Sequence, residues 1–217
     1  MIMKKILSIL LAAVMLFMLC ACSDSSDNNE KTPAQDNPTG FSLGKNVGNE
    51  YHSDFLGLTV KVPDGWDVSS DDDILEINNI NKEIYDEDHE AAVMGAEFLY
   101  DMYAVNEEDG GTVCVILEKM SSSEKLKLNL KTVIESQFES LMDTCEELGY
   151  TNIELGYKKI TVDEQEFEGY ELSSDYVGLT FRMIGLSFVR GDYLVSVTIS
   201  ALGENSVEEI LDGFDFR

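Results

Sequence analysis

The chain has 217 residues, of which 42 are acidic and 15 are basic, so its formal net charge at pH 7 is −27. This charge repels polyanions, because backbone phosphates must be neutralised by Lys and Arg side chains. The composition therefore argues against nucleic acid as a partner.

The chain begins with a charged pair, Lys4 and Lys5, followed by an apolar run from Ile6 to Leu19. The run is shorter than the roughly 20 residues that a helix needs to cross a bilayer, and a polar segment follows it. This layout is typical of a removable signal peptide. The sequence Leu-Cys-Ala-Cys at 19–22 resembles a bacterial lipoprotein signal, in which a small residue precedes the lipidated cysteine. We therefore predict a signal peptide at 1–21 and lipidation at Cys22.

The resemblance to lipoprotein signals implies a thioether-linked diacylglyceryl group on Cys22, which makes the lipid bilayer a partner. Cleavage before Cys20 would leave Leu19 at the cut, which is a poor choice. An ordinary signal peptide and an uncleaved anchor remain alternatives. Loss of residues 1–21 removes two lysines and no acid, so 42 acidic and 13 basic side chains remain, a net charge of −29. We expect an extracytoplasmic protein, lipid-anchored to the cell membrane as part of the cell envelope.

Residues 22–50 are rich in Ser, Asp, Asn, Thr, Pro and Gly and hold few large apolar side chains. Such a segment buries too little surface to offset its ordering entropy. It predicts a flexible linker behind the lipid anchor, with an end-to-end distance of roughly 30 Å.

Residues 51–217 have the size of one domain with its own core. Leu58, Val60 and Val62 alternate with polar residues and predict a half-buried strand that ends at the turn 63–65. A short helix is expected from Ser70, whose side chain can cap the first turn. Strands are expected over 102–105 and 112–118, joined by a Gly-rich hairpin turn.

The apolar spacing over 123–148 predicts one long amphipathic helix that ends at Gly149. Strand-like segments follow at 152–162, 167–173, 179–189 and 193–201. In the last of them, apolar residues alternate with Ser and Thr, which gives one apolar and one hydroxyl face. A short final helix is expected from Ser206, before Phe214 and Phe216.

This element order predicts the α+β class, with helices that cover one central antiparallel sheet. The strand that ends in Val-Pro-Asp-Gly-Trp at 62–66, the helix after a hairpin, Gly169-Tyr170 and the closing Ile-Leu-Asp-Gly-Phe at 210–214 resemble the PsbP-like superfamily. That superfamily includes the extrinsic photosystem II subunit PsbP and small bacterial lipoproteins. The resemblance covers 51–217 and implies an α/β/α sandwich and a binding or assembly role without catalysis.

The sequence has two histidines and contains neither the HExxH nor the GxxxxGK motif. We therefore expect no enzyme activity, no catalytic residues and no cofactor. The first functional hypothesis is a binding or assembly module that docks another extracytoplasmic protein. The alternative is a lipoprotein that binds a small ligand or a cation such as calcium, at a site lined by Trp66, Tyr85, Tyr100 and Tyr103.

One acidic stretch partly matches a calcium-binding loop. Asp86, Asp88, Glu90 and Glu97 fall at positions 1, 3, 5 and 12 of that register. Ala91 occupies position 6, where the sharp turn requires glycine. A helix start, in which these acids favour the N-terminal dipole, is the preferred interpretation.

Two cysteines, Cys114 and Cys145, lie on predicted apolar faces of the domain. A disulfide between them is chemically possible outside the cell. Buried free thiols are the preferred interpretation, because Cys behaves as a small hydrophobe.

Overall fold

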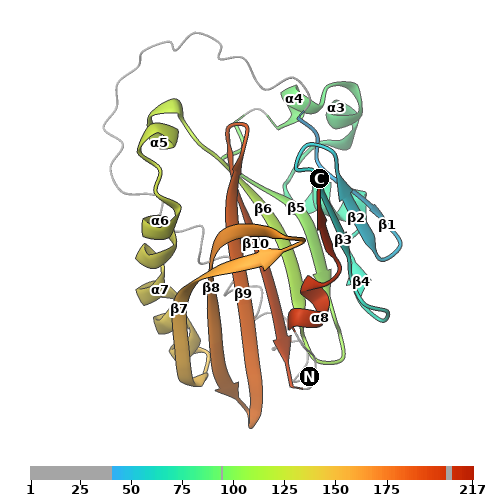
Figure 1. Cartoon of the computed structure of the whole chain (residues 1–217). Helices are drawn as coiled ribbons and strands as arrows, with labels where there is room; N and C mark the ends of the chain where they lie inside the picture. Colours follow the sequence, from blue (N-terminus) through green and yellow to red (C-terminus); the bar gives the residue numbers. More distant parts are fainter. Residues whose placement is uncertain (1–40, 94, 204–206) are drawn as a thin grey trace.

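The computed structural model describes residues 41–93, 95–203 and 207–217, and within these ranges the strands form two antiparallel sheets (Figure 1). The small sheet has the order β1-β2-β3-β11, with β1 Lys45–Val47, β2 Glu50–Ser53, β3 Leu58–Lys61 and β11 Phe214–Phe216. The large sheet has the order β4-β5-β6-β10-β9-β8-β7, with β4 Asp67–Val68, β5 Phe98–Val105, β6 Thr112–Lys119, β7 Thr151–Val162, β8 Gln165–Tyr176, β9 Leu179–Arg190 and β10 Tyr193–Leu202. The α+β class is confirmed.

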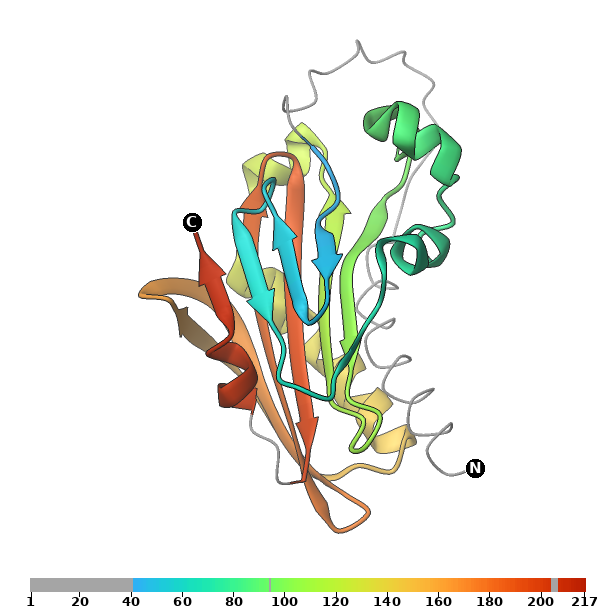
Figure 2. The same cartoon turned by 90° about the vertical axis from the view of Figure 1, so that its right-hand side faces the viewer.

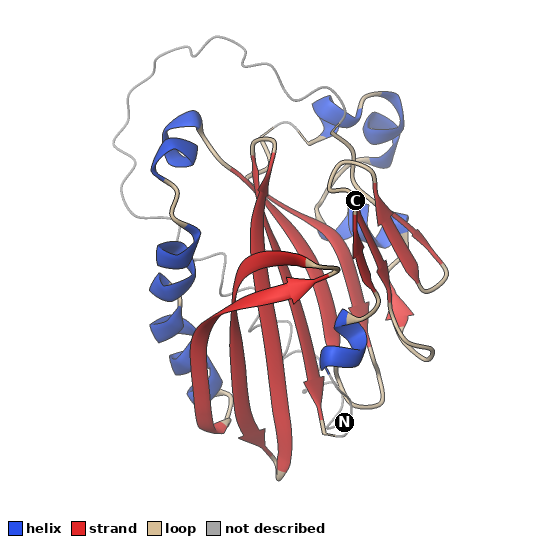
Figure 3. Ribbon diagram, viewed as in Figure 1, coloured by secondary structure: helices blue, strands red, loops and turns tan. Residues whose placement is uncertain are grey.

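The helices are short, and those between residues 122 and 147 follow one another along one side of the large sheet (Figure 3). They are α2 Asp71–Ile77, α3 Lys82–Glu87, α4 His89–Ala92, α5 Ser122–Lys127, α6 Leu130–Ser136, α7 Phe138–Glu147 and α8 Val207–Leu211. Helices α6 and α7 pack against β7 and β8, on one face of the large sheet. Figure 2 looks onto the small sheet, which lies on the opposite face from these helices.

The main core lies between the two sheets. On β10, Val195, Val197 and Ile199 are fully buried and point toward the small sheet, where they meet Val60 and Phe214 in one apolar cluster. Burial of each such side chain stabilises the fold by about 1.5–3 kcal/mol. The prediction that helices alone cover the central sheet is therefore wrong: a second sheet, accompanied by α2 and α8, covers this face.

The predicted linker extends too far into the domain. Residues 41–50, assigned to the linker from their polar composition, are part of the fold, since Phe41 and Leu43 are buried and β1 pairs with β2. Phe41 stacks on Tyr193 with ring centroids 5.0 Å apart. Two large apolar residues in a polar segment are a weak sequence signal, and their core partners lie far away along the chain. The part of the linker before residue 41 and the signal peptide lie outside the described residues.

The long helix predicted over 123–148 is three helices. The chain leaves α5 at Leu128, which has extended backbone angles, and restarts at Asn129, whose side chain accepts a hydrogen bond from the backbone N–H of Thr132. An Asn side chain that caps a new helix competes with helix continuation. Leu126, which belongs to the apolar stripe of the predicted helix and would face the core there, is consequently 89% exposed. The predicted stop at Gly149 is confirmed by its φ of 92°.

Several local predictions are confirmed. Ser70 caps α2 in a capping box with Asp73, and the hairpin of β5 and β6 and the four strands after α7 form as expected. Strand β5 begins at Phe98, earlier than predicted. The expected cap of the last helix, Ser206, lies outside the described residues, and α8 itself starts at Val207.

Candidate binding groove

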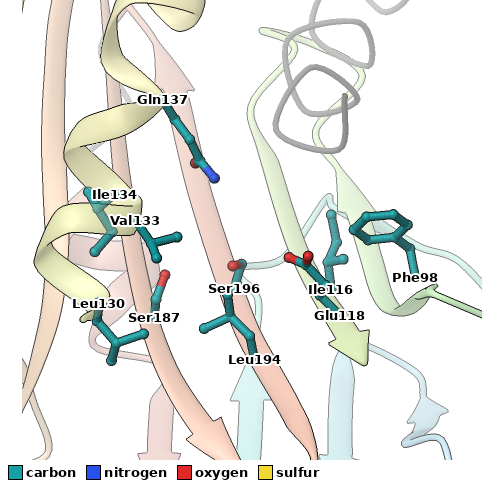
Figure 4. Close-up of a pocket in the computed structure, with 10 residues that line it drawn as sticks. All are labelled: Phe98, Ile116, Glu118, Leu130, Val133, Ile134, Gln137, Ser187, Leu194 and Ser196. Atoms are coloured by element: carbon teal, nitrogen blue, oxygen red, sulfur yellow. The ribbon is translucent and has the colours of Figure 1, made fainter. Parts of the chain in front are cut away.

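A shallow groove lies on the face of the large sheet that carries α6 and α7. Its floor consists of side chains from four adjacent strands, and its wall is helix α6 (Figure 4). The floor residues are Phe98 of β5, Ile116 and Glu118 of β6, Leu194 and Ser196 of β10, and Ser187 of β9. The wall residues are Leu130, Val133 and Ile134 of α6, and Gln137 directly after it.

The register of the strands explains how the floor is assembled. Directly paired residues of neighbouring strands point to the same face of a sheet. Phe98 pairs with Glu118, which pairs with Leu194, so these three side chains form one row across β5, β6 and β10. Ile116 pairs with Ser196, which pairs with Ser187, and these form a second row.

The hydroxyl face predicted for β10 is the face that borders the groove. Ser196 lines it, and Ser200 further along the strand is buried and hydrogen-bonds to Thr112, with 2.8 Å between the two hydroxyl oxygens. The floor therefore combines hydroxyl groups with apolar side chains.

Glu118 is the titratable side chain among the ten residues that line the groove. Its pKa is raised, first by partial burial and then by the negative charges of Glu124 and Glu97. This end of the groove therefore has a negative potential, which favours a cationic group or a hydrogen-bond donor. The other polar lining groups, Ser187, Ser196 and Gln137, can hydrogen-bond but do not ionise.

The size of the groove bears on the two functional hypotheses. Its volume of about 40 Å³ is well below the roughly 300–1,000 Å³ of typical small-molecule pockets. A groove this shallow can receive a few side chains of another protein, and it does not enclose a ligand of drug size.

The four acids of the candidate calcium loop are spread over two helices and the start of a strand. Asp86 lies in α3, Asp88 caps α4 by accepting a hydrogen bond from the N–H of Ala91, Glu90 is in α4, and Glu97 directly precedes β5. Among the described residues, no group of three or more His, Cys, Asp or Glu side chains is placed to hold a metal ion. The helix-start interpretation agrees with Asp88 and Glu90, which cap and begin α4, but not with Asp86, which lies at the C-terminal end of α3.

The four aromatic residues proposed for a small-ligand site do not converge on one pocket. Trp66 and Tyr85 pack against the core between the sheets, whereas Tyr100 packs against Cys114 and Ile116 on the groove side. Tyr103 contacts both clusters. None of the four lines the groove described above.

Both cysteines of the domain are free and buried, as the preferred interpretation expected. Burial raises the pKa of the Cys114 thiol and raises that of Cys145 to about 11. The predicted lipidation site, Cys22, lies outside the described residues. Within the described ranges, no helix has the length and apolar character needed to span a bilayer.

The groove cannot be recognised from local patterns in the sequence. Leu130 and Ile134 fit the apolar spacing of a helix and Ile116 and Leu194 fit strands, but the pairing of β6 with β10 joins residues about 80 positions apart in the sequence. The hydroxyl face of β10 was the one local signal that this face differs from the core face.

Comparison with known proteins finds no family model that matches the chain and no curated protein that matches it. Among solved structures, a protein from Bacteroides thetaiotaomicron superposes with a TM-score of 0.40 and 9% identity, covering 78% of this chain and 48% of that one. The chain thus spans about half the length of that protein. LpqN, a protein involved in cell envelope biogenesis of Mycobacterium tuberculosis, superposes with a TM-score of 0.37 and 12% identity, covering 72% of this chain and 76% of LpqN. These likenesses identify neither a family nor a function for this chain.

Proposed function

We propose that this protein is a membrane-anchored extracytoplasmic lipoprotein whose domain is a non-catalytic binding module, and that the groove beside α6 receives another extracytoplasmic protein. The observation that carries the proposal is the groove itself: two rows of buried and half-buried side chains from β5, β6, β10 and β9 line it beside the apolar wall of α6. A protein partner fits its shallow shape.

The lining favours a partner segment of defined chemistry. Val133, Leu130 and Ile116 offer contacts to apolar side chains. Glu118, whose pKa is raised by burial and by neighbouring acids, favours a Lys or Arg side chain of the partner. Burial of this carboxylate on binding is costly unless it is paired, so a basic residue opposite Glu118 contributes specificity.

The anchor completes the proposal. Acylation at Cys22 would hold the domain at a membrane surface, and two acyl chains give stable attachment where one gives only marginal attachment. The resemblance of 51–217 to the PsbP-like superfamily belongs to the same proposal, because that superfamily implies a binding or assembly role.

In-cell photocrosslinking tests the groove. A photoreactive amino acid at Val133, which lines the groove, is compared with one at Glu135, which is exposed on the same helix and pairs with Lys131. We expect a discrete protein adduct from position 133 that weakens when Glu118→Gln is added, and no such adduct from position 135. Equal adduct patterns at the two positions contradict the proposed binding surface.

Metabolic labelling with palmitate tests the anchor separately. The wild-type chain should incorporate label and sediment with membranes, and the Cys22→Ser variant should do neither. Labelling that persists in Cys22→Ser contradicts the proposed lipidation site.

A further inference from the structure

The first described residues, 41–47, form a strap across the edge of the domain, on the opposite face of the large sheet from the groove. Three backbone N–H groups of the strap donate to side chains of three different elements. Leu43 donates to the Tyr85 hydroxyl of α3 at 3.1 Å, Gly44 to Oδ1 of Asp101 in β5 at 2.5 Å, and Asn46 to Oδ1 of Asp71 in α2 at 2.8 Å. Pairing of β1 with β2 supplies further strap contacts.

Asp101 is at the centre of this arrangement. It lies in a bulge of β5, where the pairing register with β6 shifts between Tyr100 and Met102. Asn78, which directly follows α2, hydrogen-bonds to both backbone polar groups of Tyr100. A bulge re-aims the side chain of the extra residue. Here it turns a carboxyl group into the interior, where Asp101 is fully buried.

The Asp101 carboxyl accepts two hydrogen bonds, both from groups without charge. Oδ2 accepts from the Tyr51 hydroxyl of β2 at 2.5 Å, and Oδ1 accepts from Gly44 of the strap. Among the described residues no Lys, Arg or His forms an ion pair with it. The strap's own charged residue, Lys45, is exposed.

The other titratable groups that face Asp101 are two tyrosines, Tyr51 and Tyr85, and one acid, Asp71, whose charge repels it. Burial first of all, with a smaller contribution from Asp71, raises the pKa of Asp101 to about 6. The two hydrogen bonds oppose this shift without cancelling it.

The strap also depends on a close approach at Gly44. A side chain at this position would collide with the ring of Tyr51, so only glycine lets the backbone come near enough to reach Asp101. The apolar end of the strap, Phe41, stacks on Tyr193 and contacts Phe55 edge to face. Release of the strap would therefore uncover aromatic surface and lengthen the segment that leads to Cys22.

We infer that the strap is a proton-responsive clasp: protonation of Asp101 locks residues 41–47 onto the domain, and ionisation of Asp101 makes the strap easier to release. The sign follows from the buried site. Strap release that admits solvent to Asp101 removes burial, the largest cause of its raised pKa, together with the Gly44 hydrogen bond, a smaller and opposing cause. The carboxyl therefore binds its proton more tightly in the closed state than in the open state. Acid therefore favours the closed strap, and neutral pH shifts the equilibrium toward release.

Amide hydrogen exchange of the purified chain tests the clasp, with the β9 and β10 amides as an internal reference. After correction for intrinsic exchange, the protection of Leu43, Gly44 and Asn46 should fall between about pH 4 and pH 7.5, by at most about a hundredfold, because one pKa unit corresponds to a tenfold change and the whole shift is about two units. The Asp101→Asn variant should show no such change. Strap protection in the wild-type chain that stays constant relative to β9 and β10 overturns the inference.

A second variant keeps the test decisive if Asp101→Asn does not fold. Tyr85→Phe removes the acceptor for Leu43 and leaves Asp101 in place. It should lower strap protection by a similar factor at every pH and preserve the pH dependence. If Tyr85→Phe abolishes the pH dependence, a group other than Asp101 causes that dependence, and the role of Asp101 is overturned. The groove is not involved, so the crosslinking result does not affect this test.

Discussion

The two faces of the large sheet differ in how they are covered, and strand β10 has side chains on both faces. On one face Val195, Val197 and Ile199 are packed beneath the small sheet and are at most 1% exposed. On the other face Ser196 borders the groove, because α6 and α7 pack against β7 and β8 rather than across the whole sheet. The first face stabilises the fold, and the second leaves side chains available for contacts.

The largest expected difference between the faces is in stability. Ile199→Ala should lower the free energy of unfolding by about 2–5 kcal/mol, because it leaves a cavity in the core. Ser196→Ala on the opposite face is the matched control and should change the free energy of unfolding by about 0.5 kcal/mol or less. Urea denaturation measures both variants, and similar losses would show that the two faces do not divide these roles.

The covered face also holds Asp101, which should make stability depend on pH. Its folded-state pKa of about 6 exceeds the ordinary value of 3.8, so Asp101 favours the folded state below pH 4, and this contribution of about 3 kcal/mol is lost as the pH rises through 6. The difference in unfolding free energy between the wild type and Asp101→Asn should follow this curve. A difference that stays constant from about pH 4 to pH 7 contradicts the assignment.

On the groove side, the part of the sheet that lies beneath α6 and α7 is closely packed, whereas the groove itself is not. Gly185 of β9 lies directly beneath the ring of Tyr170, and an added Cβ would collide with that ring. Gly185→Ala should therefore cost about 1–3 kcal/mol through overpacking. Thermal denaturation measures the loss, and Gly156→Ala on β7, where a Cβ would meet no neighbour, is the control.

The smallest expected effect is in thiol reactivity. Cys114 and Cys145 are both buried, and burial raises the pKa of Cys145 to about 11. At neutral pH both should resist alkylation in the folded protein and react on unfolding without a reductant, which mass spectrometry can follow. Rapid alkylation of Cys114 in the folded state would mean that the groove side is open as far as β6.

Local patterns in the sequence predicted much of the secondary structure. The capping box of Ser70, the stop at Gly149 and the alternation of β10 depend on residues within one turn or one strand, so they can be recognised from spacing alone. The long helix was predicted wrongly for the same reason: apolar spacing continues past Asn129, and the side-chain cap that restarts the helix competes with that pattern.

The sequence by itself determined the acidic charge, the expectation of a lipid-anchored leader ending at Cys22, and the α+β class. The tertiary structure alone decided that a second sheet covers one face, that residues 41–47 close over Asp101, and that β6, β10 and α6 assemble a groove. The physical reason is distance along the chain. Charge and periodicity are local properties, whereas burial of a carboxyl or alignment of side chains across strands depends on partners that only folding brings together.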